Sequence, residues 1–219
     1  MANTLTVQLI QDGENKTIIK VDGVVDTSDM AVTGTIGASG FTTTAGLKTI
    51  AFVAGALVPT LGQSLTFGDS ATTFSAGTYV TAITDATHIV VNQAAKATNA
   101  AAAITITGTT GNIVLLDPLL LSAVDQAGTL ASKLRIDRIV YDVEDLLAVN
   151  LIWEGTTNAN IWHLVGRGKL EFGKQFGGLS NNATVPTGKI LLTTQGWASS
   201  AILSFSFTME CTKQFAPPM

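Results

Sequence analysis

One segment of the sequence has the spacing of a phosphate-binding loop. Gly168 to Gln175 reads GKLEFGKQ, the pattern G-x-x-x-x-G-K followed by glutamine. Such a loop needs a serine or threonine after the lysine to hold magnesium, with a strand before it and a helix after it. Gln175 occupies that position, and Gly177 and Gly178 follow where the helix would run. We therefore expect a strand and a turn here, and no nucleotide cofactor.

The two histidines and a group of acids were considered for hydrolytic or metal chemistry. His88 and His163 lie far apart, and no serine or cysteine stands at a diagnostic spacing for a nucleophilic triad. Asp142, Glu144 and Asp145 supply fewer oxygen ligands than a calcium loop needs, and one cysteine argues against structural zinc. The sequence therefore predicts no catalytic residue, no metal site, no cofactor and no enzymatic activity. A hydrolase on a β scaffold is the alternative, which lost activity in a Glu171 or His163 variant would support.

The composition restricts the partners. Charged residues make up 13% of the 219 residues, against about 25% in an average soluble domain, and hydrophobic residues make up 46%. The net charge is −4 without any basic run, which argues against nucleic acid. The apolar run Ile50–Val58 has nine residues, short of the roughly 20 that a spanning helix needs, so no membrane partner is expected. The start, MANTLTVQL, does not resemble a secretory signal.

The charge distribution indicates two structural units. The 84 residues from Met30 to Ile113 carry four charged side chains, whereas the flanking segments carry the rest and all three tryptophans. The simplest organisation is an insertion at a loop. We expect an outer β-sandwich formed by residues 1–29 and 114–219, with residues 30–113 as an inserted small β domain.

The outer segments alternate apolar and polar residues with a period of two. In SAILSFSFTMEC, the residues Leu203, Phe205, Phe207, Met209 and Cys211 share one face. LLAVNLIWEG alternates in the same way, and TLTVQLI places Leu5, Val7 and Leu9 on one face. KLRIDRIVYDV slips by one residue near Arg138, which predicts a β-bulge. Alternation with short connections predicts an all-β protein with antiparallel sheets, a jelly-roll-like sandwich.

The large aromatic residues are candidates for the core and also for a subunit interface, where aromatic residues and arginine are enriched. Arg167 stands between Gly166 and Gly168, where another chain could approach closely. The candidate interface residues are Trp153, Trp162, Arg167, Phe172, Phe176, Trp197 and Phe215.

Several segments carry a resemblance to a known group of proteins. NLIWEGTTNANIWHLVGRG, the loop FGGLSNNA and the run TGKILLTTQGW resemble tailed-bacteriophage virion proteins built as β-sandwiches. SAGTYVTAITDATHIVVNQAAKATNAAAAITITG resembles a small β module that recurs in phage structural proteins. The resemblance implies a structural component of the virion.

We therefore expect a capsid decoration or cement protein on the capsid surface. Its partners would be the major capsid protein or other virion subunits, and the resemblance implies a homo-oligomer, with a trimer preferred. The alternative is a tail, fibre or host-binding virion protein whose inserted domain contacts the cell surface. A glycan-binding insert would need exposed aromatic residues, and residues 30–113 contain only Phe41, Phe52, Phe67, Phe74 and Tyr79.

Overall fold

The computed structural model describes residues 3–25, 34–36, 41–52, 58–67, 73–98, 104–106, 112–125, 127–196 and 202–215. Contacts divide the chain into two compact units. The outer unit comprises Met1–Ser28 and Leu115–Met219, and the inserted unit comprises Asp29–Val114. Each unit is considered by itself below.

In its described residues, the outer unit contains ten strands and two short helical turns. The strands are β1 (Thr4–Asp12), β2 (Lys16–Val25), β10 (Ile113–Leu116, whose first half belongs to the inserted unit), β11 (Lys133–Val143), β12 (Leu147–Thr157), β13 (Ala159–Leu164), β14 (Arg167–Glu171), β15 (Leu179–Ser180), β16 (Thr184–Gly196) and β17 (Leu203–Gln214). The turns are the 3-10 segment η1 (Pro118–Leu120) and the single helical turn α1 (Gly173–Phe176).

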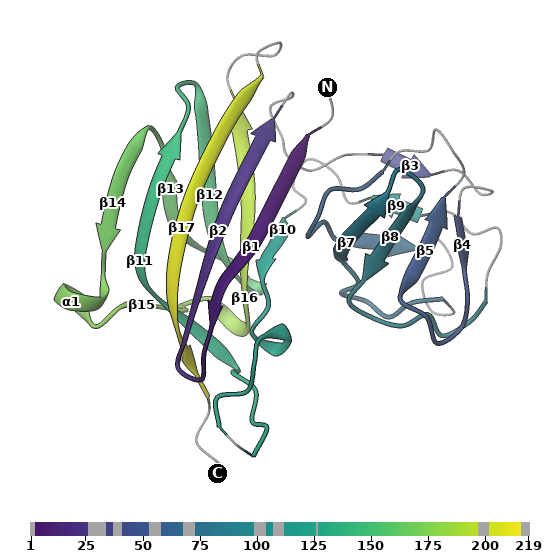
Figure 1. Cartoon of the computed structure of the whole chain (residues 1–219), viewed down its shortest axis with the longest axis horizontal. Helices are drawn as coiled ribbons and strands as arrows, with labels where there is room; N and C mark the ends of the chain where they lie inside the picture. Colours follow the sequence, from purple (N-terminus) through teal and green to yellow (C-terminus); the bar gives the residue numbers. More distant parts are fainter. Residues whose placement is uncertain are drawn as a thin grey trace. The chain divides into compact units, whose positions relative to one another are not determined.

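These strands form two sheets that lie face to face (Figure 1). One has six strands in the order β1-β2-β17-β11-β14, with β15 also paired to β11; the other has the order β10-β16-β12-β13. Neighbouring strands run antiparallel, as in the pairs β2 with β17, β11 with β14 and β12 with β16. The prediction of an all-β protein with antiparallel sheets is confirmed.

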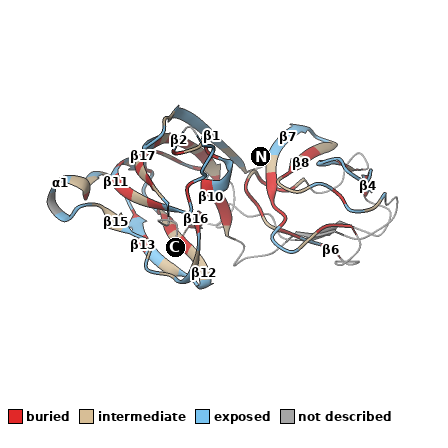
Figure 2. Cartoon of the chain, turned by 90° about the horizontal axis from the view of Figure 1, so that it is seen from below, coloured by how far each residue is buried: buried red, intermediate tan, exposed pale blue. Residues whose placement is uncertain are grey.

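Alternate residues of the central strands are buried between the two sheets (Figure 2). The five residues expected on one face of β17, from Leu203 to Cys211, are all buried. β12 contributes Leu147, Val149, Leu151 and Trp153 in the same way. Burial raises the pKa of the Cys211 thiol, and the nearby carboxylates of Asp137 and Glu210 raise it further. The period-two pattern therefore identified the inward faces correctly.

The β-bulge predicted near Arg138 is present one residue earlier. The register between β11 and β17 shifts between Ile136 and Arg138, which leaves Asp137 as the extra residue. Its carboxylate accepts hydrogen bonds from Arg135 Nε at 2.9 Å and from the Thr212 hydroxyl, and its carbonyl accepts one from Phe172 N at 2.8 Å. These partners compensate the burial of a carboxylate, which is costly when unpaired.

The first strand differs from its expected burial. Leu5 and Val7 are half-buried, whereas Leu9 is 51% exposed. β1 is the last strand of its sheet and pairs with β2 alone among the described strands. The register shifts between Leu9 and Gln11, so the end of β1 bends away from the regular ladder. An edge strand with a bulge has fewer neighbours to cover it.

The part of the inserted unit that the structure describes contains seven further strands in two small antiparallel sheets, ordered β3-β9-β6 and β4-β5-β8-β7. Their bounds are β3 (Gly34–Ile36), β4 (Phe41–Thr43), β5 (Thr49–Phe52), β6 (Leu65–Phe67), β7 (Val80–Asp85), β8 (His88–Val91) and β9 (Ile104–Ile106). The core includes Phe41, Phe67 and Phe74, with the rings of Phe67 and Phe74 stacked at 4.7 Å.

Trp153 and Trp162 give a matched test of the core. Trp153 is 1% exposed, whereas Trp162 is 41% exposed on the neighbouring strand. We expect Trp153→Ala to lower the free energy of unfolding of the outer unit by about 3–5 kcal/mol, because it leaves a large cavity. Trp162→Ala should cost about 1 kcal/mol. Denaturant unfolding followed by the fluorescence of the remaining tryptophans measures both; equal costs would contradict the described packing.

Candidate interaction surface

The outer face of the six-stranded sheet carries rows of polar and charged residues. The strand registers align Arg167, Asp142, Ser206, Asp22 and Thr6 in one row across five strands. Arg167 Nε lies 2.8 Å from Asp142 Oδ1. Burial raises the pKa of Asp22, but hydrogen bonds from the Lys20 ammonium and Ser206 outweigh it and lower that pKa overall. Opposite charges on adjacent strands stabilise this face.

A second row lies four residues further along the strands. It joins Glu171, Arg138 and Glu210. Glu171 contacts the cations of Arg138 at 3.6 Å and of Lys169 at 2.5 Å. The hydrogen bond from Lys169 lowers the pKa of Glu171, and the hydrogen bond to Glu210 raises the pKa of Lys16. Most charges on this sheet face are therefore neutralised within the chain.

One end of this face is hollowed. A depression of about 780 Å³ is lined by hydroxyl and carboxylate side chains and Arg167, together with the apolar residues Val24, Val143 and Phe205. Among its lining residues are Asp142, Glu144, Asp145 and Ser204. Glu144 accepts hydrogen bonds from Ser204 N at 2.6 Å and from the Ser204 hydroxyl at 3.1 Å. The hollow can exchange hydrogen bonds with a polar partner surface.

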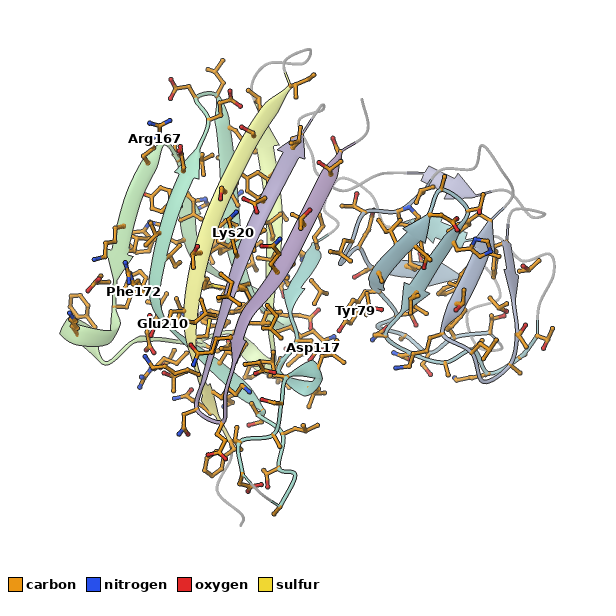
Figure 3. The ribbon with its side chains drawn as sticks, in the orientation of Figure 1. Lys20, Tyr79, Asp117, Arg167, Phe172 and Glu210 are labelled. Carbon is orange, nitrogen blue, oxygen red and sulfur yellow. The ribbon has the colours of Figure 1, made fainter. Side chains whose placement is uncertain are left out.

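Aromatic side chains lie beside the β14 edge of the same unit. The ring centroids of Trp162 and Phe172 are 5.6 Å apart. Phe172 follows β14 at the opposite end of this strand from Arg167 (Figure 3). Phe176 N donates to Phe172 O at 2.9 Å, which closes the turn α1, and the Phe176 side chain is 76% exposed. Exposed aromatic residues of this kind are typical anchors of protein interfaces.

Gly168 allows strand β14 to pair with β11 beside the side chain of Tyr141. Gly168 lies opposite Tyr141, and a Cβ added at Gly168 would stand 2.5 Å from the Tyr141 hydroxyl oxygen. Only glycine leaves room for the tyrosine ring to cross the neighbouring strand. The spacing noted in the sequence between Gly168 and Gln175 is therefore a strand followed by the single turn α1, as expected.

Six of the seven candidate interface residues fall within the described ranges, and they separate into an exposed and a buried group. Trp162, Arg167, Phe176 and Phe215 are exposed on the outer unit. Trp153 and Phe172 are buried, so their interface assignment is corrected: Trp153 fills the core, and Phe172 supports Trp162. Trp197 lies outside the described residues.

The two histidines belong to different units, whereas Asp142, Glu144 and Asp145 line the hollow described above. His163 is exposed on β13, and its Nδ1 contacts Asn150 Oδ1. His88 lies 3.0 Å from Asp85 in the β7–β8 hairpin; hydrogen bonds from Thr87 and then His88 lower the pKa of Asp85 to about 2. Within the described ranges, no three histidine, cysteine or acidic residues form a group suited to a metal ion.

A buried ion pair was missed by the sequence analysis. The ammonium of Lys213 is fully buried; it contacts Asp12 Oδ1 and donates to Ser122 O at 2.8 Å and to the Ser122 hydroxyl at 2.9 Å. Ser122 N donates to Asp12 Oδ2 at 2.6 Å. The cluster joins β1, β17 and the segment after η1. No local pattern reveals it, because its members are far apart in the sequence.

The function of this chain is inferred from its sequence, its fold and its exposed side chains. No protein-family model, no curated protein and no solved structure matches the chain. In the part of the chain that the structure describes, no helix is long and apolar enough to cross a membrane. What the outer unit presents is a charge-paired sheet face flanked by exposed aromatic residues.

The ion pair between Asp12 and Lys213 should make the free energy of unfolding depend on pH in the acid range. Burial raises the pKa of Asp12, but hydrogen bonds from Lys213 and Ser122 and the Lys213 charge lower it overall, below 3.8. The unfolded state therefore binds more protons in acid, so this stabilisation is present above pH 3.8 and is lost as the pH falls through the folded pKa. We expect Asp12→Asn to cost about 3 kcal/mol at neutral pH, because it leaves Lys213 buried without its counter-charge.

Denaturant unfolding followed by tryptophan fluorescence at several pH values measures this effect. The Asp12→Asn variant should also lose less stability than the wild type on acidification. Asp145→Asn, in an exposed turn, is the control and should change stability by about 0.5 kcal/mol or less. An Asp12→Asn variant as stable as the control would contradict a role for the buried pair.

Proposed function

We propose that this chain is a structural virion protein of a tailed phage, a capsid decoration or cement protein that binds and stabilises the capsid shell. The observation that carries the proposal is the exposure of Trp162, Phe176 and Phe215 on the outer unit. Rigid aromatic side chains that the chain leaves uncovered favour burial against another subunit. The resemblance of the outer segments to phage virion proteins supplies the class of partner: the major capsid protein or other virion subunits.

The outer unit is proposed to be jelly-roll-like, on the basis of its strand order. Eight strands can be numbered from one to eight in chain order: β2, β10, β11, β12, β13, β14, β16 and β17. The two sheets then have the strand orders 1-8-3-6 and 2-7-4-5. The first strand pairs with the eighth, the second with the seventh, the third with the sixth and the fourth with the fifth. Two Greek keys wrapped into two sheets have this order. β1 and β15 are additions to it.

In this scheme, residues 30–113 form a separate domain inserted in the connection between the first and second jelly-roll strands. The outer domain supplies the shell contact, and the chain forms a homo-oligomer at the capsid surface. The charge-paired sheet face forms hydrogen bonds with polar partner groups, while the aromatic residues bury apolar area. Weak contacts repeated over a symmetric shell sum to a large stabilisation.

The host-binding alternative has less support from the inserted unit. Its five aromatic residues, Phe41, Phe52, Phe67, Phe74 and Tyr79, are all buried. A glycan platform built from exposed aromatic rings is therefore missing from this unit, whose aromatic residues all fall within the described ranges. A tail or fibre position is left as the alternative placement within the virion.

Reconstitution onto shells that lack this chain tests the proposal. We expect the purified protein to bind such shells from the source phage and to raise the temperature at which they open. Phe176→Ser should weaken binding by about tenfold or more, because it removes an exposed anchor without disturbing the core. Leu47→Ser, at an exposed leucine of the inserted unit, is the matched control and should bind as the wild type. Wild-type protein that fails to bind the shells would overturn the capsid role.

A further inference from the structure

Strand β1 is a long, uncharged sheet edge. It spans Thr4–Asp12, and from Thr4 to Gln11 it contains no charged residue, proline or glycine. Among the described strands it pairs with β2 alone, so one side of its backbone lacks a neighbouring strand. Leu9 and Ile10 are more than half exposed at its end. Such an edge is a template for pairing with another strand.

Most other edges of the described sheets are shorter than β1 and are charged, buried or irregular; β13, at the edge beside β12, has six residues and one register shift. β14 has five residues, three of them charged: Arg167, Lys169 and Glu171. β10 has four residues, all buried. β7 carries two register shifts against β8 and ends at Asp85, and β4 has three residues. Charges, bulges and shortness are the usual devices against edge pairing, and β1 has only the bulge near Ile10.

We propose that β1 pairs antiparallel with β1 of a second copy of this chain, joining two six-stranded sheets edge to edge. The segment is its own complement. With Val7 opposite Val7 of the second copy, Leu5 lies opposite Leu9 and Thr6 lies opposite Gln8.

This register keeps apolar residues on one face and polar residues on the other. It covers part of the exposed Leu9 side chain and brings no like charges together. Because each copy presents the same strand, the contact has two-fold symmetry and closes after two copies. A strand of another protein would need an alternation of apolar and polar residues that matches β1, whereas a second copy of this chain has that alternation already. The contact is independent of the virion role and relates copies in pairs, whatever other contacts they make.

A charge-swap experiment tests this pairing. Thr6 and Gln8 are exposed on the polar face, opposite Asp22 and Lys20 of β2. Two double variants are compared: Thr6→Lys with Gln8→Lys, and Thr6→Glu with Gln8→Glu. Each therefore creates one favourable and one unfavourable charge pair with β2 of the same chain. Between copies, each double variant places like charges opposite one another, whereas a mixture of the two places opposite charges together.

Sedimentation at protein concentrations between about 1 µM and about 1 mM measures the dimer. We expect the wild type to dimerise, each double variant to dimerise about tenfold more weakly, and their equimolar mixture to recover the dimer. Thr42→Lys with Thr157→Lys adds the same charge at exposed positions outside β1 and should dimerise as the wild type. Circular dichroism confirms that all variants are folded.

Amide hydrogen exchange supplies a second measurement. Among the backbone amides from Leu5 to Leu9, those that point away from β2 should exchange more slowly as the wild-type concentration rises. A wild type that stays monomeric over the whole range would overturn the proposal, as would variants that dimerise as well as the control. Protection, in the monomer, of the β1 amides that point away from β2 would overturn it too, because another segment of the same chain would then occupy the edge.

Discussion

The pairing of β2 with β17 is the constraint on which the rest of the structure depends. Its register runs from Lys16 opposite Thr212 to Val25 opposite Leu203, so nearly the whole of both strands is hydrogen-bonded. This ladder places the second strand of the sequence beside the last one, in the middle of one sheet. The long intervening chain must then leave and return, and the contacts place Asp29–Val114 in a unit of their own. The buried contact of Lys213 with Asp12 extends the same closure beyond the ladder.

Because side chains alternate across these strands, the outer unit has apolar residues on the inward side of the sheet and charged residues on its outward side. Inward residues such as Phe207 and Met209 form the core, and outward residues such as Glu210 and Lys20 form the charge-paired face (Figure 3). Because successive residues of a strand point to opposite faces, one sequence pattern specifies both. The chain has few charged residues, and many of them lie on one sheet face, where they form ion pairs with one another. A few aromatic residues, Trp162 and Phe176 among them, are exposed beside this sheet. The proposed docking role follows from that combination.

Several of these features could be predicted from the sequence, and the reasons are local. The inward faces of β12 and β17 follow from period-two alternation, and the bulge at Asp137 follows from a one-residue slip in that period. Other features could not be predicted. Leu9 continues the alternation of β1 yet is exposed, because burial depends on neighbouring strands that the local pattern does not specify. Trp153 and Trp162 look equivalent in sequence, but the first enters the core and the second does not. The cluster of Asp12, Ser122 and Lys213 depends on contacts between distant segments.

The central functional claim is that many copies of this chain are bound to the capsid of a tailed phage. The most direct test is the number of copies per purified particle from the source, measured against the major capsid protein by calibrated mass spectrometry. The account predicts a fixed ratio to the capsid protein that corresponds to a decorating layer spread over the whole shell. A few copies per particle would move the protein to the tail or connector. Its absence from particles would contradict a virion role.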